Sequence, residues 1–190
     1  MLKTRSLIAP ALAIVALLAA GCGSSTKQSP ADKYAQQAEQ EAATAPKTVA
    51  QAAPVKVTVV NPLPAEADLS KKPAVSKGNG PAPANLQAED LVVGKGPAAK
   101  DGDKLTVQYV GVLYKNGKQF DTSWGKQPFT FPLGQGQVIQ GWDQGLVGMK
   151  VGGRRKLIIP AALAYGATGS PPKIGPNEPL IFDIDLKKIG

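Results

Sequence analysis

The 190-residue chain contains no histidine and a single cysteine, Cys22. Nucleophilic machinery of the Ser–His–Asp or Cys–His kind needs an imidazole, so these mechanisms are excluded. The usual zinc site of histidine and cysteine ligands is excluded too, and no intramolecular disulfide can form. We therefore expect any catalysis to proceed without an imidazole, a metal or another cofactor.

Aromatic residues are also scarce, and they are unevenly placed. Tyr34 is the only one among the first hundred residues, and the other nine lie between Tyr109 and Phe182. A stable core needs large apolar side chains. The packed domain is therefore predicted in the C-terminal half of the chain.

The formal net charge is +8, but the basic residues are scattered. The one dense run, Arg154-Arg155-Lys156, is interpreted as a single strand with a solvent-exposed face. The chain lacks the basic stripe typical of nucleic-acid-binding proteins, so a nucleic-acid partner is not expected.

The N-terminus has the pattern of a secretory signal. Lys3 and Arg5 precede an apolar run over residues 7–20, which is shorter than the roughly 20 residues that a membrane span needs. The ending Leu18-Ala-Ala-Gly-Cys22 resembles a bacterial lipobox, which implies a signal peptide over residues 1–21 and lipidation of Cys22. The protein is then expected outside the cytoplasm, lipid-anchored to the cell membrane. An ordinary cleaved signal with an unrelated cysteine, or an uncleaved anchor, is the alternative.

A tether is predicted between this signal and the folded part. Residues 22–69 are rich in Ala and Pro and offer little to bury, so we expect a disordered, flexible tether, followed by a folded domain over 70–190 with its core at 102–190. Within the tether, residues 55–60 alternate in polarity and could form a strand. Whether that segment joins the domain is left open.

Alternating polarity predicts several antiparallel strands in the folded part. Apolar residues alternate from Leu105 to Tyr109 and from Leu180 to Leu186, and Asn116-Gly117 indicates a hairpin with positive φ at both residues. One segment, between Gly136 and Gly152, has helical spacing. The expected fold is an α+β domain whose sheet curls over one helix.

Four motifs follow one another in the folded part: Val107-Gln-Tyr-Val-Gly111, Phe120-Asp121, the run from Phe131 to Met149 (FPLGQGQVIQGWDQGLVGM), and Ala164-Tyr-Gly-Ala-Thr-Gly169. In this order and spacing they resemble one family, the FKBP-type peptidyl-prolyl cis-trans isomerases. The resemblance covers about residues 86–190. It implies an FKBP-like fold, with an antiparallel sheet of five to six strands wrapped around one short helix.

The chemistry that the resemblance implies is rotation of an Xaa–Pro bond, which faces a barrier of roughly 18–20 kcal/mol. The catalytic residues implied are Tyr109, Asp121, Trp142, Tyr165 and Phe182. The substrate-binding residues implied are Phe120, Phe129, Val138, Ile139 and Ile174. The arginine that often accompanies the site aspartate has no counterpart here, where only Gly125 and Lys126 are available.

Each of these residues also has a plainer interpretation. The aromatic residues could be ordinary core, and Asp121 could be an ordinary turn residue. At the level of function, a non-catalytic chaperone or scaffold that binds proline-containing segments is the alternative to an isomerase, and a solute-binding lipoprotein is a weaker one. The partners expected are proline-containing polypeptides, macrolide inhibitors and a membrane, and the protein is expected to be a monomer.

Overall fold

A computed structural model describes residues 55–61 and 64–190 of the chain. The predicted signal peptide, Cys22 and most of the predicted tether lie outside these residues. In chain order the elements are β1 (Val57–Val59), α2 (Pro64–Ala67), β2 (Gln87–Val92), β3 (Lys104–Leu113), β4 (Gln119–Thr122), β5 (Phe129–Pro132), α3 (Gln140–Gly145), β6 (Arg154–Ile159), the 3₁₀ turn η1 (Ala161–Leu163) and β7 (Leu180–Ile189).

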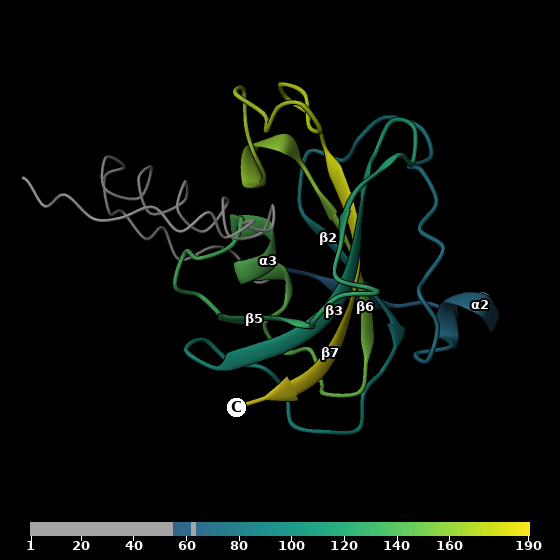
Figure 1. The fold of residues 1–190 in the computed structure, drawn as a ribbon, viewed down its shortest axis with the longest axis vertical. Coiled ribbons are helices and arrows are strands. Elements are labelled where there is room, and N and C mark those ends of the chain that lie inside the picture. Colours follow the sequence, from purple (N-terminus) through teal and green to yellow (C-terminus); the bar gives the residue numbers. More distant parts are fainter. Residues whose placement is uncertain (1–54, 62–63) are drawn as a thin grey trace, which may run out of the picture.

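One sheet organises the domain (Figure 1), in the order β1-β2-β6-β7-β3-β4, with β5 also paired to β3. The β4 and β5 strands occupy successive halves of the same edge of β3. All neighbours are antiparallel except β1 and β2, which are parallel. The α+β fold class is confirmed, but the sheet has seven strands rather than five or six, and one pair is parallel.

The additional strands come from segments whose pattern is weak. The β1 strand has only three residues, all exposed, and its formation depends on pairing with β2 rather than on burial. The β2 strand carries only two buried residues, Ala88 and Leu91. Residues 57–59 of β1 and Glu66 of α2 therefore contact the domain ahead of residue 70, where the sequence placed its start.

The two long central strands form as their alternation predicts. Along β3, Leu105, Val107 and Tyr109 face the helix side, and their exposed fractions are at most 7%. The same side of β7 presents Leu180, Phe182, Ile184 and Leu186. These two faces supply most of the core that lies between the sheet and α3.

The helix is shorter than its sequence pattern indicates. It covers Gln140–Gly145, whereas Val138 and Met149 lie outside it. Ile139, at its start, has an extended ψ of 146°, and Leu146 closes it by donating its N–H to the Trp142 carbonyl. The apolar residues at helical spacing outside α3, such as Val138 and Met149, lie in loops that pack against the same core.

The turn between β3 and β4 also differs from the expected one. Gly117 has a positive φ of 71°, but Asn116 is not among the residues with positive φ. The Asn116 side-chain oxygen instead accepts a hydrogen bond from the Lys118 N–H at 2.9 Å. The predicted hairpin is confirmed, whereas the prediction of a positive φ at both Asn116 and Gly117 is wrong for Asn116.

The outer face of β6 and β7 is buried, contrary to the expectation of a solvent-exposed face. The exposed fractions of Arg154, Asp183 and Asp185 are 0%, 0% and 1%. Arg154 forms a two-pronged ion pair with Asp185, with nitrogen–oxygen distances of 2.5 and 2.8 Å. A segment from earlier in the chain covers these charged side chains. The alternation of polar and apolar residues along β6 and β7 therefore does not indicate a solvent-exposed face here.

The covering segment, residues 64–83, is called the strap. It begins with α2, which lies on the opposite side of the sheet from α3 (Figure 1). The backbone carbonyls of Glu66 and Lys71 accept hydrogen bonds from Arg154 at 2.7 and 3.1 Å. Further along, the Gly78 N–H donates to the Tyr114 carbonyl at 2.8 Å. The strap is thus bound along the back of the sheet.

Candidate functional site

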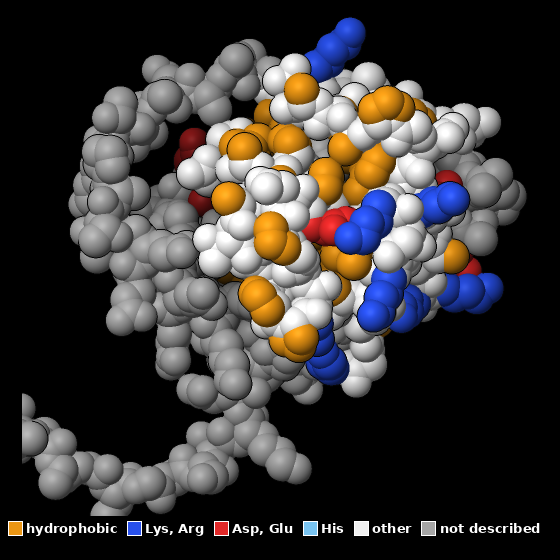
Figure 2. Space-filling view, turned by 90° about the horizontal axis from the view of Figure 1, so that it is seen from above, with side chains coloured by type: hydrophobic (Ala, Val, Ile, Leu, Met, Phe, Trp, Pro, Cys, Tyr) orange, Lys and Arg blue, Asp and Glu red, His pale blue; other side chains and the backbone are white. Residues whose placement is uncertain are grey.

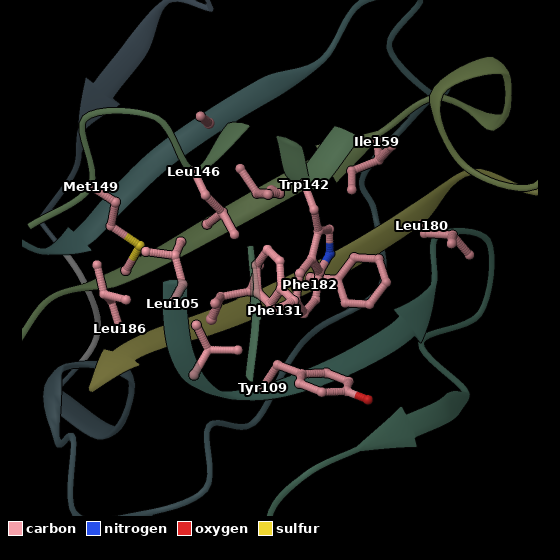
Figure 3. Packing of buried hydrophobic residues seen from close by; sticks show 14 of the residues in the cluster. Leu105, Tyr109, Phe131, Trp142, Leu146, Met149, Ile159, Leu180, Phe182 and Leu186 are labelled. Carbon is pink, nitrogen blue, oxygen red and sulfur yellow. The ribbon is translucent and has the colours of Figure 1, made fainter. Parts of the chain in front are cut away.

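Aromatic side chains from four different strands and α3 meet on the helix side of the sheet. They are Tyr109, Phe120, Phe129, Phe131, Trp142 and Phe182, hereafter the ring cluster. Figure 3 shows Tyr109, Phe131, Trp142 and Phe182 pointing toward one another. The strands place these rings because each lies at an inward position of its own alternation.

Trp142 is the centre of this cluster. Its ring centroid lies 5.2 Å from that of Tyr109 and 5.3 Å from that of Phe182, with interplanar angles of 83° and 85°. Phe131 and Phe129 approach it at 5.5 and 6.2 Å. Such edge-to-face pairs are the preferred geometry of aromatic rings. The indole N–H of Trp142 is buried and has no hydrogen-bond partner among the described residues.

Gly111 makes room for two of these rings. A Cβ atom at this position would lie 2.7 Å from Phe120 Cζ and 2.7 Å from Phe182 Cε1, closer than real Cβ atoms approach other atoms. Phe120 and Phe182 in turn pack edge to face, with centroids 5.5 Å apart. Gly111, the last residue of the first sequence motif, is therefore needed because it has no side chain. The alternation of apolar and polar residues along β3 does not indicate this role.

Asp121 stands at the edge of the ring cluster and is tied to it. The Tyr109 hydroxyl donates a hydrogen bond to Asp121 Oδ2 at 2.5 Å. The other carboxylate oxygen accepts the Thr122 N–H at 2.8 Å and lies 3.9 Å from Lys126 Nζ. Lys126 thus places a positive charge beside Asp121, where the sequence has no arginine to accompany this carboxylate.

Thr122 and Ser123 hold the backbone of Tyr109. The Thr122 hydroxyl donates to the Tyr109 carbonyl at 2.8 Å, and the Tyr109 N–H donates to Ser123 Oγ at 2.9 Å. Ser123 also donates to the Gln108 side chain. Tyr109 is therefore fixed at its phenol and at both backbone groups, and sequence reasoning missed these two hydroxyls because they carry no chemistry of their own.

The remaining predicted site residues pack against the same core. Val138, Ile139, Phe129 and Tyr165 are half-buried, and Ile174 is only 1% exposed. Residues 170–179, the flap, close on themselves through a β-bridge between Ser170 and Ile174. Figure 2 views this end of the molecule from above, where hydrophobic side chains gather across the middle of the face beside an acidic and a basic side chain in contact.

Asp143 organises the loop that leads into α3. Its two carboxylate oxygens accept the N–H groups of Gly134 and Gly136 at 2.8 and 2.9 Å. Burial raises the pKa of Asp143 above its ordinary value, although these two hydrogen bonds oppose the shift. The loop that it closes carries Val138 and Ile139, and sequence reasoning did not single out Asp143.

The site offers apolar aromatic surface with a few polar groups at its edge. Among residues 55–61 and 64–190, no group of three or more carboxylate, cysteine or histidine side chains could hold a metal ion. Within the same ranges no helix is long and apolar enough to cross a bilayer. The arrangement can bind a small apolar ring against Trp142 and orient a polar group near Asp121 and Tyr109.

The sequence and fold of this domain are similar to those of known proteins. The family described as FKBP-type peptidyl-prolyl cis-trans isomerase matches residues 96–187. An FK506-binding protein of Streptomyces anulatus is 53% identical over 118 residues, which are 61% of this chain and 95% of that protein. The crystal structure of AtFKBP13 has a TM-score of 0.52 and 41% identity, and the match covers 57% of this chain and 96% of that one.

The chain therefore belongs to the FKBP-type peptidyl-prolyl cis-trans isomerase family. Other relatives are longer: FK506-binding protein 4 of Dictyostelium discoideum is 58% identical over 104 residues, which are 55% of this chain but only 28% of that protein. The family match begins at residue 96, so the strap and β1 lie outside it.

Proposed function

We propose that this protein is a peptidyl-prolyl cis-trans isomerase that accelerates Xaa–Pro rotation in proteins folding outside the cytoplasm. Uncatalysed exchange takes tens of seconds or more, which is slow enough to limit folding. The observation that carries the proposal is the convergence of Tyr109, Phe182 and Trp142, at 5.2 and 5.3 Å between ring centroids, on one buried aromatic surface with Asp121 at its edge.

This surface suits the reaction because the planar amide is more polar than the twisted one. Resonance places negative charge on oxygen and positive charge on nitrogen, and rotation removes this charge separation. A water-poor aromatic site therefore favours the twisted amide over the planar ground state, which lowers the barrier. No proton is transferred to solvent and no covalent bond breaks, so the absence of histidine from the chain is compatible with this chemistry.

The proposed roles follow from the positions of the side chains. Trp142 supports the proline ring from below, and Tyr109, Phe129 and Phe182 form the walls, with Phe120 behind Phe182. Val138 and Ile139 extend the apolar lining, and Ile174 lies in the flap over the site. Tyr165 donates its hydroxyl to the substrate carbonyl, and Asp121 holds the phenol of Tyr109.

A protease-coupled assay on a short Xaa-Pro peptide tests the proposal. Phe182→Ala and Trp142→Leu are expected to lower kcat/KM by on the order of tenfold or more, because each removes a ring that contacts the amide. Asp121→Ala is expected to have a smaller effect. Circular dichroism on each variant controls for unfolding.

Binding without turnover is the competing outcome of this assay. A wild-type protein that binds the peptide but leaves its isomerisation rate at that of buffer would be a chaperone or scaffold, and the catalytic proposal would fail. Relatives whose names refer to FK506 binding support a further expectation, that a macrolide of this type competes with the peptide. Competition is measured by titrating the macrolide into the same assay.

We also propose that the protein is anchored to the outer side of a cell membrane through a lipid on Cys22. The single cysteine follows a short apolar run at the position that a bacterial lipobox requires. Acyl chains contribute about 0.8 kcal/mol per buried CH₂, so several chains on one residue give stable attachment. Mass spectrometry of the mature N-terminus tests this, and an unacylated product that begins at another residue would contradict it.

A further inference from the structure

Arg155 is a buried arginine on the helix side of the sheet that the proposed chemistry does not use. Its side chain is 3% exposed and forms a two-pronged ion pair with Asp90 of β2, with nitrogen–oxygen distances of 2.7 and 3.0 Å. Its remaining terminal nitrogen donates to the carbonyls of Gly145 and Val147 at 2.8 and 3.1 Å. One guanidinium therefore joins β6, β2 and the C-terminal end of α3.

The end of α3 is a place where such a donor is needed. The last carbonyls of a helix have no partner within the helix, and a positive charge near them is favourable. The α3 helix has six residues, so its C-terminal carbonyls make up a large part of its backbone acceptors. Arg155 satisfies one of them directly and continues to Val147 in the following turn.

The backbone of the helix also packs directly against side chains of β6. A Cβ atom at Gly141 would lie 2.4 Å from Ile159 Cγ2, and one at Gly145 would lie 2.7 Å from Leu157 Cδ2. The two glycines therefore set how closely the helix approaches β6, and Arg155 fixes its end along that strand. Trp142 lies between the two glycines, so its position depends both on the close approach of the helix to β6 and on the hydrogen bond from Arg155 to Gly145.

We propose that Arg155, held by Asp90, is a positioning residue for Trp142 and so for the floor of the substrate site. The inference rests on the proposed isomerase function for its effect on rate, but the placement of Trp142 can be measured independently. Rotation of an amide is sensitive to the geometry of its surroundings, so a small displacement of the indole lowers the rate without abolishing binding.

The neighbouring residue provides a matched control. Arg154 is also a buried arginine with a two-pronged carboxylate pair, to Asp185, and it also donates to two backbone carbonyls. Its side chain points to the opposite face, toward the strap and away from the ring cluster. Arg154→Met and Arg155→Met therefore remove the same kind of interaction from the two sides of one strand.

The experiment uses the full chain with Trp124→Phe, which leaves Trp142 as the single tryptophan. The indole is labelled as 5-fluorotryptophan, and its ¹⁹F resonance is recorded together with kcat and KM on an Xaa-Pro peptide. Arg155→Met is expected to move or broaden the resonance and to lower kcat/KM about tenfold, mostly through kcat. Arg154→Met is expected to leave the resonance in place and kcat/KM within about twofold.

Milder substitutions keep the test decisive if either methionine variant unfolds. Arg155→Lys retains a charge but cannot reach Asp90 and both carbonyls with one ammonium, so an intermediate shift and rate are expected, with Arg154→Lys as the control. An unmoved resonance in both Arg155 variants, or equal changes in the Arg154 and Arg155 pairs, would overturn the inference. Wild-type inactivity would instead refute the proposed function, and the ¹⁹F comparison would still decide the placement of Trp142.

Discussion

Some single residues in this domain affect packing or stability because they leave space, or place a charge, on one face of the sheet. Gly111 and Asp183 are examples from opposite faces. Gly111 leaves room for Phe120 and Phe182 on the helix side, and Asp183 occupies the buried outer side of β7. Neither residue is expected to contact substrate, yet both are expected to have measurable effects.

Gly111→Ala should lower kcat/KM by on the order of tenfold. The new methyl group would overlap the rings of Phe120 and Phe182, so these rings must shift, and a shift of Phe182 changes its packing on Trp142. Overpacking of this kind costs about 1–3 kcal/mol of unfolding free energy. Kinetics and urea unfolding measure the two effects, and unchanged kinetics in a folded variant would show that the position of the Phe182 ring is not critical.

Asp183 should make the protein less stable as the pH rises from about 4 to about 7. Burial raises the pKa of its carboxyl to about 7, and neither carboxylate oxygen has a hydrogen-bond partner among the described residues. Because the folded state holds the proton more tightly than the unfolded state, stabilisation is complete below the ordinary carboxyl pKa and is lost as pH rises through the folded value. Urea unfolding between pH 4 and 8 measures this slope.

Asp183→Asn should remove most of this slope and should be at least as stable as the wild type at pH 8. Asp185→Asn is the matched control on the same strand face. Asp185 pairs with the Arg154 guanidinium, so its substitution should destabilise the fold at pH 8. Destabilisation by both variants to the same extent would contradict the assignment of Asp183 as the carboxyl group whose ionised form burial disfavours most.

At the scale of elements, the loop before α3 and the helix itself form one unit held by side chains. Asp143 closes the loop from within the helix, and Arg155 holds the far end. The helix has no side-chain N-cap and only six residues. Its position therefore depends on these contacts more than on its own propensity.

Asp143→Ala should weaken substrate binding more than it lowers kcat. Removal of the carboxylate leaves the Gly134 and Gly136 N–H groups without their partner, and the loop that carries Val138 and Ile139 loosens. We expect KM to rise several-fold and the unfolding free energy to fall by about 1–2 kcal/mol. Asp143→Asn, which keeps two polar atoms but only one acceptor, should lie between the alanine variant and the wild type.

The elements with strong patterns could be predicted from the sequence, and those stabilised by distant contacts could not. Strands β3 and β7 alternate cleanly, and the core positions on them are confirmed. By contrast, β1 forms through pairing with β2, and the charged side chains at 154, 183 and 185 are buried only because the strap covers them. A period of two indicates two faces but does not say whether the polar face meets water.

In the candidate site, too, some residues could be predicted from the sequence and others could not. The family resemblance grouped Tyr109, Asp121, Trp142 and Phe182, and the ring contacts and the Tyr109–Asp121 hydrogen bond show that they are neighbours in space. Thr122, Ser123, Asp143 and Arg155 were missed. Their roles arise from which backbone groups they reach after folding, and such contacts leave no periodic signal in a sequence.

At the scale of the whole molecule, the sheet separates two regions with different tasks. The α3 helix lies on one side of the sheet, and the strap's α2 helix lies on the other (Figure 1). The ring cluster and Ile174 of the flap pack together on the α3 side. The strap and the sheet share an apolar contact between Val75 and the group Val110, Val112, Tyr114 and Ile181. Stability is therefore expected to depend on the strap, and catalysis on the opposite face.

A chain that begins at residue 84 should be less stable than one that begins at residue 55, by on the order of 3 kcal/mol, because the outer apolar cluster and Arg154 lose their cover. Its kcat/KM, measured where it is fully folded, should stay within about threefold. Tyr114→Phe in the longer chain is a milder comparison, since it removes only the hydroxyl that donates to the Asn79 and Pro81 carbonyls. A large loss of kcat/KM on truncation would show that the strap reaches the substrate site through the sheet.

The alternation along β7 makes this strand intolerant of any change in its length. Phe182 and Ile184 face the rings, while Asp183 and Asp185 face the buried charges, so a slip of one residue would exchange the two sets. Carboxylates would then enter the aromatic core, and Ile184 or Leu186 would lie opposite Arg154. A single-residue insertion in β7 should therefore abolish folding altogether, whereas one at an exposed position of the flap leaves both sets in register.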